Sequence, residues 1–277
     1  MSGANAESWD LGRGLAGYRW RAAAPRAAIL LSHGFAEYAE RYVARYNRLI
    51  PNLTGAGFDV YALDLAGHGR SRGARGVADL ARAVEDHQAA RRAIANGGQS
   101  LFVFAHSLGG LIAAASVARD QDGVAGVILS APALLIHAPA HLRAIAGAVA
   151  AVAPGARLAP PLDAEGLSRI PEEVAAYRSD AMISDPRVPA RTGASAIAVS
   201  EASWPLYRSW RTPTLVLHGE RDRATDPEGS KRFVEAIASA DKRLILYPEG
   251  RHELLNDLDR DAALREILAW LQARTPT

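Results

Sequence analysis

The sequence predicts an α/β fold with a mostly parallel, twisted sheet, helices on both of its faces and an inserted helical cap. Three observations lead to this prediction. Short aliphatic runs alternate with longer segments that have helical periodicity. The short runs are almost continuously apolar, which is typical of parallel strands buried on both faces. The alternation is interrupted once, by a long stretch rich in alanine, proline and arginine.

The predicted elements follow one another in a regular order. A pair of weaker strands is expected within residues 9–22, around a glycine turn. Six stronger strands are expected at residues 26–32, 58–64, 101–105, 124–130, 213–218 and 243–247. Helices are expected between and after them, at residues 39–53, 80–95, 108–118, 229–238 and 260–273. Strands and helices in this order predict a parallel sheet covered on both faces.

The interruption predicts a helical cap at residues 134–194, between two core segments at 1–133 and 195–277. It begins directly after the strand expected at 124–130, at the edge where α/β sheets place their functional sites. A floppy surface excursion is the alternative. Long loops without secondary structure are uncommon in compact domains, so the cap is the favoured interpretation.

Composition excludes several classes of protein. The formal net charge is only +2, so no strong field favours nucleic acid. Disulfides, thiolate catalysis and cysteine-ligated metals are excluded because the 277 residues include no cysteine. No histidine–carboxylate spacing suggests a metal site, and we expect no cofactor. Residues 1–10 have neither a basic start nor an apolar run, and no uninterrupted apolar stretch is long enough to span a bilayer. We therefore expect a soluble, cytoplasmic protein.

The strongest local pattern is LFVFAHSLGG, residues 101–110. An apolar strand runs directly into Ser107, and a helix-forming run follows. A serine on such a tight strand-to-helix turn projects its hydroxyl above the sheet. Small residues at Ala105 and Gly109 let the neighbouring backbone approach, and the helix N-terminus favours developing negative charge. Ser107 is therefore the predicted nucleophile, and an ordinary turn with an idle serine is the alternative.

A nucleophilic serine needs a base, and the base needs a carboxylate that orients it. In folds with this elbow, the chain order is serine, acid and then histidine. The predicted base is His252, in a loop after the last expected strand, whereas His218 is interpreted as a packed residue at a strand end. The predicted acid is Asp222, in the turn that follows a strand. Asp226 begins a helix and fits a capping role, and Glu220 is the third carboxylate considered.

The stabilising donors for the oxyanion are predicted on either side of the nucleophile. One is the backbone N–H of Leu108, which follows the serine, and the other is that of Phe35, after the first core strand. Gly34 lets this loop bend towards the substrate, and His33 is expected to hold the loop. The glycine-rich stretch 64–71 lacks the spacing of a phosphate-binding loop and is interpreted as a tight turn.

Several stretches together resemble the monoacylglycerol lipase-type hydrolases. This group belongs to the α/β-hydrolase superfamily and also contains lysophospholipase-like and serine-aminopeptidase-like members. The matching stretches are HGFAEYAERY (33–42), DLAGHGRSRG (64–73), AHSLGG (105–110), YRSDAMISDPRV (177–188), HGERDRATDP (218–227) and GRHEL (250–254). The resemblance implies a Ser-His-Asp esterase that acts on monoglyceride-like lipids, with a cap that shapes an acyl tunnel.

The resemblance also implies that Glu37 and Arg41 order the loop after the first strand, with a surface i,i+4 ion pair as the alternative. Two positions depart from the family pattern, because Ala105 replaces a glycine and Phe35 is bulkier than the residue usual there. A large side chain at 35 is expected to reshape the acyl pocket.

The predicted reaction is hydrolysis of a small-molecule carboxylic ester through an acyl-enzyme on Ser107. Two alternatives stay open. The same fold also serves C–C hydrolysis, amide hydrolysis and acyl transfer, and a non-catalytic binding protein is possible on the same scaffold. The apolar segment 142–152 of the expected cap is compatible with weak contact to a membrane surface and equally with lining the acyl pocket.

Overall fold

The computed structural model describes residues 6–136 and 138–275. Within them, one eight-stranded sheet has the order β1-β2-β4-β3-β5-β6-β7-β8. The six strands β3 to β8 run parallel to one another, and β1 and β2 add an antiparallel edge next to β4. The strands are β1 (Glu7–Ser8), β2 (Gly17–Trp20), β3 (Ala27–Ser32), β4 (Phe58–Leu63), β5 (Leu101–His106), β6 (Val124–Ser130), β7 (Thr214–Gly219) and β8 (Lys242–Tyr247).

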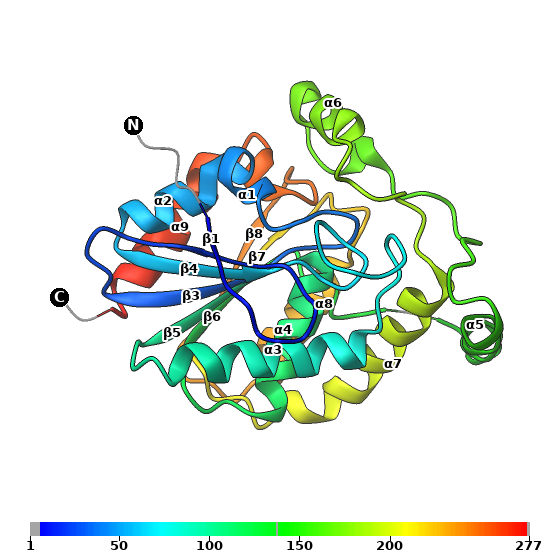
Figure 1. Cartoon of the computed structure of the whole chain (residues 1–277), viewed down its shortest axis with the longest axis horizontal. Coiled ribbons are helices and arrows are strands. Elements are labelled where there is room, and N and C mark those ends of the chain that lie inside the picture. Colours follow the sequence, from blue (N-terminus) through cyan, green and yellow to red (C-terminus); the bar gives the residue numbers. More distant parts are fainter. Residues whose placement is uncertain (1–5, 137, 276–277) are drawn as a thin grey trace.

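Helices cover both faces of this sheet (Figure 1). The helices α2 and α9 lie on one face, and α3 and α4 lie on the other. The predicted fold is confirmed, although β1 begins before the expected range of the weaker strands. The helices are α1 (Arg41–Ala44), α2 (Leu49–Gly55), α3 (Leu80–Ala95), α4 (Ser107–Arg119), α5 (Ala140–Val152), α6 (Pro171–Ser179), α7 (Ala190–Tyr207), α8 (Pro227–Ala236) and α9 (Arg260–Gln272).

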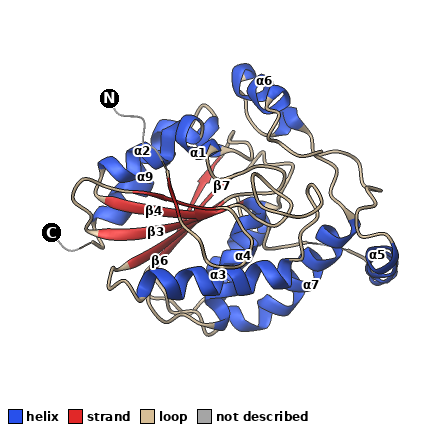
Figure 2. Cartoon of the chain, in the orientation of Figure 1, coloured by secondary structure: helices blue, strands red, loops and turns tan. Residues whose placement is uncertain are grey.

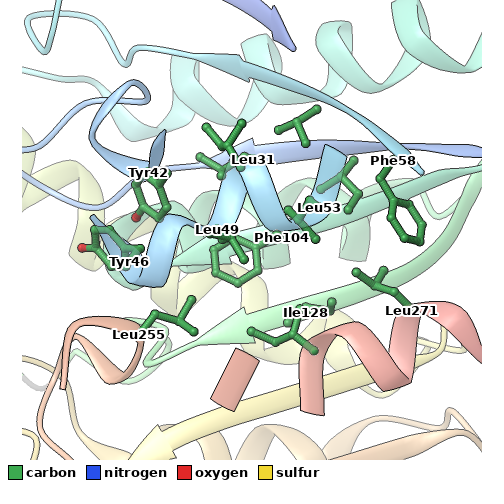
Figure 3. Packing of buried hydrophobic residues seen from close by; sticks show 14 of the residues in the cluster. Leu31, Tyr42, Tyr46, Leu49, Leu53, Phe58, Phe104, Ile128, Leu255 and Leu271 are labelled. Carbon is green, nitrogen blue, oxygen red and sulfur yellow. The ribbon is translucent and has the colours of Figure 1, made fainter. Parts of the chain in front are cut away.

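The core is divided by the sheet, because alternate residues of a strand point to opposite faces. Along β3, Ile29 and Leu31 enter one cluster, whereas Leu30 enters another on the opposite face. Figure 3 shows the first cluster, in which side chains from α2 and α9 pack on those of β3 and β5. Burial on both faces explains why the strands are almost continuously apolar and therefore recognisable in the sequence.

The expectation of one helix over residues 39–53 is wrong. The backbone turns into the left-handed region at Tyr46, Asn47 and Arg48, with φ angles of 53°, 51° and 52°. A three-residue 3-10 turn, Tyr46–Arg48, therefore separates α1 from α2. The break is stabilised by a buried hydrogen bond from the backbone N–H of Tyr46 to the side chain of Asn256, and by stacking of the Tyr46 ring on Tyr42, with centroids 4.0 Å apart.

The interruption between β6 and β7 is largely helical, with α5, the 3-10 turn Ala164–Gly166, α6 and the start of α7. Figure 2 shows α5 and α6 standing away from the sheet. The expected boundary at residue 194 falls inside α7, and the later part of this helix packs against α4 through Ala196 and Val199. No helix in the described residues is long and apolar enough to cross a membrane. The expectation for residues 1–10 lies partly outside the described residues, which exclude 1–5, 137 and 276–277.

Candidate active site

Ser107 lies at a sharp turn between β5 and α4. It is the first residue of α4 and has a φ of 53°, a left-handed conformation that costs a non-glycine residue roughly 1 to 3 kcal/mol. The crowding beneath the turn explains the small residues that follow it. A Cβ atom at Gly109 would lie 2.4 Å from the carbonyl oxygen of His33, and one at Gly110 would lie 2.6 Å from Pro132 Cβ. The tight packing holds the serine in this conformation.

The three side chains predicted as nucleophile, base and acid lie together. His252 Nε2 lies 2.9 Å from Ser107 Oγ, and His252 Nδ1 lies 2.7 Å from Asp222 Oδ2. The three residues follow β5, β7 and β8, whose carboxyl ends share one edge of the sheet. A proton on Nδ1 is fixed by the carboxylate, so Nε2 is left as an acceptor for the serine hydroxyl.

The charges in this cluster favour an ionised acid and a basic histidine. Burial alone would raise the pKa of Asp222, but the charge of His252 and hydrogen bonds from His218 and His252 hold it well below its usual range. Burial opposes protonation of His252, yet the attraction of Asp222 outweighs it and raises the pKa of the imidazole. The histidine is therefore a better proton acceptor than its burial alone would allow.

Asp222 is held by more groups than the sequence predicts. Its Oδ1 accepts hydrogen bonds from the backbone N–H groups of Ala224 and Thr225, at 2.7 and 3.0 Å. Its Oδ2 lies 2.7 Å from Thr225 Oγ1 and 3.1 Å from His218 Nε2. His218 is packed, as expected, but it also contacts the acid. The loop pattern Asp-x-x-Thr after a strand is the signal that would have identified Thr225.

The other two carboxylates considered from the sequence have different environments. Asp226 accepts a hydrogen bond of 2.9 Å from the backbone N–H of Glu228 and caps α8. Glu220 is exposed, and its carboxylate lies 3.9 Å from Lys231 Nζ. Of these three acids, Asp222 is the one that contacts His252.

The backbone donors predicted for the oxyanion lie beside the serine. Leu108 is the second residue of α4, so its N–H has no acceptor within the helix. The N–H of Phe35 donates to no group in the described part of the chain. The loop that carries Phe35 lies close to the nucleophile, because a Cβ atom at Gly34 would be 3.1 Å from Ser107 Cβ. This packing explains the glycine.

His33 holds the loop from below, as the sequence predicts. Its Nε2 accepts a hydrogen bond of 3.0 Å from the backbone N–H of Leu65, and its Nδ1 lies 2.8 Å from the carbonyl oxygen of Gly34. The ring is completely buried. It therefore ties the loop after β3 to the loop after β4, and it is not in contact with Ser107.

Glu37 and Arg41 are buried, only 2% and 4% exposed, so the alternative of a surface ion pair is wrong. Glu37 accepts a hydrogen bond of 2.6 Å from the backbone N–H of Gly34. Arg41 binds Glu37 at 3.1 Å and also Glu253, through two hydrogen bonds of 2.8 and 3.1 Å. Burial opposes the charge of Glu253, but Arg41 outweighs it and lowers the pKa of the carboxyl to about 2. No local pattern in the sequence signals the pairing of Arg41 with Glu253, which are 212 residues apart.

A mainly apolar cavity of about 840 Å³ opens beside Ser107 and His252. Its volume lies in the range of pockets that enclose a small organic ligand. The Phe35 ring faces it and packs edge-on against His68, with centroids 5.6 Å apart. No three metal-ligating side chains are assembled within 6–136 and 138–275. Other apolar residues of the wall are Leu108, Ile145, Val149, Leu162, Val188 and Ile197.

The sequence of this chain matches a known protein family. Residues 23–259 match the family described as serine aminopeptidase, S33. The chain belongs to this family. A monoacylglycerol lipase from Mycolicibacterium smegmatis is 36% identical to this S33 member over 252 residues, covering 89% of this chain and 88% of the relative. A monoglyceride lipase from Homo sapiens is 32% identical over 263 residues, with coverages of 91% and 84%.

Solved structures agree with the family assignment. The crystal structure of Paleococcus ferrophilus monoacylglycerol lipase superposes with a TM-score of 0.84 and is 32% identical, covering 94% of the S33 chain and 99% of that protein. A monoglyceride lipase from Saccharomyces cerevisiae in complex with a substrate analogue also gives a TM-score of 0.84, at 24% identity, which supports the fold. The predicted resemblance to monoacylglycerol lipase-type α/β-hydrolases is confirmed.

Proposed function

We propose that this S33 enzyme hydrolyses carboxylic esters of the monoacylglycerol type through an acyl-enzyme on Ser107. One observation carries the proposal. An unbroken hydrogen-bond chain from Ser107 through His252 to Asp222 opens onto the mainly apolar cavity. The names of the relatives, monoacylglycerol and monoglyceride lipases, support this class of substrate.

In the first half of the reaction, Ser107 Oγ attacks the acyl carbonyl while His252 Nε2 takes its proton. Asp222 steadies the imidazolium that forms, and the backbone N–H groups of Phe35 and Leu108 stabilise the oxyanion. The imidazolium then protonates the oxygen of the leaving alcohol, and the C–O bond breaks. The acyl group stays on Ser107 as an ester.

In the second half, a water molecule takes the place of the alcohol. His252 removes a proton from it as it attacks the acyl-enzyme, and the same two N–H groups stabilise the second oxyanion. Collapse of this intermediate returns the proton to Ser107 and releases the carboxylic acid. His252 thus carries every proton transfer between Ser107, the leaving alcohol and the attacking water.

The segment 134–194 acts in this proposal as a cap that encloses the acyl chain. Ile145, Ala146 and Val149 of α5 line the cavity from the side away from the sheet. Leu162 and Val188 add further apolar surface from the same segment. An alkyl chain in this cavity leaves water, at a gain of about 0.8 kcal/mol for each buried CH₂ group. Binding is therefore expected to strengthen with chain length until the cavity is full.

Turnover of a monoacylglycerol series, from short to long acyl chains, tests the proposed function. The wild type is expected to release fatty acid, and Ser107→Ala is expected to lose at least about 10³-fold in kcat, because removing a triad member leaves only the binding and oxyanion contributions. The matched control is Ser116→Ala, a buried serine further along α4. It is expected to retain the wild-type rate. Equal rates for Ser107→Ala and the wild type would refute the assignment.

Two exposed apolar side chains of the cap, one of which (Leu158) also lines the cavity, support a further part of the proposal, weak contact with a membrane surface. Val152 and Leu158 are 85% and 77% exposed. Exposed apolar side chains next to a lipid-binding cavity favour contact with the acyl region of a bilayer.

Flotation with phosphatidylcholine vesicles tests this contact. The amount of protein that floats with the vesicles is expected to be at least several-fold lower for the double variant Val152→Asp and Leu158→Asp than for the wild type, because two charges oppose burial in lipid. Leu258→Asp changes an apolar residue that is 66% exposed on the core and serves as the matched control. Equal flotation of the double variant and the wild type would exclude contact through the cap.

A further inference from the structure

The carboxylate of Asp222 contacts a second buried histidine besides His252. Nε2 of His218 lies 3.1 Å from Asp222 Oδ2, and His252 Nδ1 lies 2.7 Å from the same oxygen. His218 is the fifth residue of β7, and its side chain has no exposed surface. It is therefore held by the sheet itself, whereas Asp222 and His252 lie on the loops that follow β7 and β8.

On the other side of its ring, His218 contacts Ser230 of α8. Its Oγ lies 2.7 Å from His218 Nδ1, and it is completely buried. An ionised carboxylate only accepts hydrogen bonds, so the proton of a neutral His218 lies on Nε2, towards Asp222. Nδ1 is then an acceptor, and the hydroxyl of Ser230 is its donor.

We propose that His218 is a positioning residue for the triad. Its Nε2–H holds the carboxylate of Asp222 and shares its negative charge with His252, while Ser230 donates to Nδ1 on the other side of the ring. The inference rests on the proposed function, because it concerns the base of that reaction. His218 forms no hydrogen bond with Ser107 within the described residues and does not line the cavity. Its effect therefore reaches the reaction through Asp222.

The sharing of Asp222 has a defined effect on the base. A hydrogen bond to Asp222 matters most while His252 is neutral, because the carboxylate then has no positive neighbour. Loss of the His218 donor therefore destabilises the neutral state of His252 more than the charged state, and it raises the pKa of the base. His252 accepts a proton from Ser107 only when it is neutral, so the acidic limb of kcat/KM moves to higher pH.

The other titratable and charged groups near this cluster have partners other than His218. The ring of His106 lies 4.7 Å from that of His252 between centroids, and burial lowers the pKa of His106 to about 4. Glu37 and Glu253 both pair with Arg41. Arg223, beside Asp222, is exposed and pairs with Asp163. A shift of the acidic limb in a His218 variant thus reports on the contact with Asp222.

The test compares the pH dependence of kcat/KM for a water-soluble p-nitrophenyl ester in the wild type, three variants of the His218–Ser230 pair and one control variant. His218→Phe keeps the ring but removes the donor, and its acidic limb is expected to rise by about half to one pH unit. His218→Gln places an amide near the position of Nε2 and is expected to restore most of the wild-type limb. Ser230→Ala removes the partner of Nδ1 and is expected to give a smaller shift in the same direction. This variant keeps the proposal testable if His218→Phe does not fold.

The matched control uses a second buried histidine–serine pair. His87 Nδ1 lies 2.8 Å from Ser116 Oγ, and His87 is buried and lies outside the cavity wall. His87→Phe is expected to leave the acidic limb in place. A His218→Phe variant with lower kcat but an unmoved limb would overturn the proposal, as would a limb that moves equally in His87→Phe. A limb that moves to lower pH would also overturn it.

NMR titration of the His252 ring separates this inference from the proposed function, because it requires no turnover. The pKa of His252 is expected to be higher in His218→Phe than in the wild type, by the same half to one unit. A wild type without Ser107-dependent esterase activity would refute the proposed function alone. An identical His252 titration in both proteins would refute the role of His218 alone.

Discussion

Two parts of the segment between β6 and β7 contact the core in different ways. Residues 163–169, called the anchored segment here, form backbone and side-chain hydrogen bonds with the loop that carries His252. The helix α5 packs mainly on α7 and keeps most of its described side chains exposed. Both parts lie over the same cavity. Under the proposed function, the anchored segment would hold the base His252 in place, and α5 would cover the acyl chain.

The anchored segment runs beside the histidine loop. The backbone N–H of Glu253 donates to the carbonyl oxygen of Leu167 at 2.8 Å, directly after the base in sequence. Ser168 Oγ donates to the carbonyl oxygen of Asn256 at 2.7 Å. Such bonds fix the backbone on both sides of the turn, so this part of the expected cap is continuous with the active site.

Asp257 is the centre of this attachment. Its carboxylate has no exposed surface and accepts hydrogen bonds from the backbone N–H groups of Arg169 and Arg251, at 2.7 and 2.9 Å. The guanidinium of Arg169 adds two more, at 3.0 and 2.9 Å. Burial would raise the pKa of Asp257, but the guanidinium of Arg169 and the backbone donors outweigh it and lower the pKa.

Among the changes that test this comparison, Asp257→Ala is expected to have the largest effect, because it detaches the anchored segment from the histidine loop. The change leaves two backbone N–H groups and the Nε–H of Arg169 without their acceptor, and it is expected to cost about 2 to 3 kcal/mol of unfolding free energy. It is also expected to lower kcat by about 10-fold, because a mobile loop no longer presents His252 to Ser107. Urea unfolding and steady-state kinetics measure the two effects. A variant with unchanged stability and kcat would show that the attachment has no bearing on the base.

Residues that follow buried strands could be predicted from the sequence, whereas contacts between two loops could not. The meeting of Ser107, Asp222 and His252 at one edge of the sheet was predictable, because each follows a recognisable buried strand and parallel strands bring their carboxyl ends together. Asp257 and Arg169 form a pair across 88 residues, between two loops with no periodicity. Nothing local distinguishes Asp257 from an exposed loop aspartate, so this contact could not be predicted from residue patterns.

The break between α1 and α2 was missed for a related reason. Residues 39–53 have helical periodicity, and the left-handed turn at Tyr46 contains no glycine that would signal it. The turn is stabilised by a partner from the distant histidine loop, the side chain of Asn256. Tertiary contacts outweigh the local preference here, as they do at Asp257.

A substitution in α5 tests whether this helix limits the space for the acyl chain. Ala146 lines the cavity, and Ala146→Trp is expected to fill part of it. The kcat/KM for a long-chain monoacylglycerol is expected to fall by about 10-fold, since roughly two CH₂ groups lose their place in the cavity. The value for a short-chain ester is expected to stay near that of the wild type. Kinetics across a chain-length series provide the measurement.

The control for this change is Ala144→Trp, which adds the same side chain to an exposed position of α5 outside the cavity wall. It is expected to leave the chain-length preference as it is. An equal loss for short and long esters in Ala146→Trp would contradict the distinction drawn here, because α5 would then affect the chemistry as well as the binding of the acyl chain.

The smallest effect is expected where α5 has an ion pair of its own. Arg143 of α5 contacts Glu201 of α7, and both side chains are exposed. Solvent screens such a pair, so Glu201→Ala is expected to change the unfolding free energy by no more than about 0.5 to 1 kcal/mol and to leave kcat unchanged. Urea unfolding of Glu201→Ala and Asp257→Ala under the same conditions compares their free energies of unfolding directly. A loss as large as that of Asp257→Ala would mean that α5 is held to the core as firmly as the anchored segment, and the two parts would then share one role.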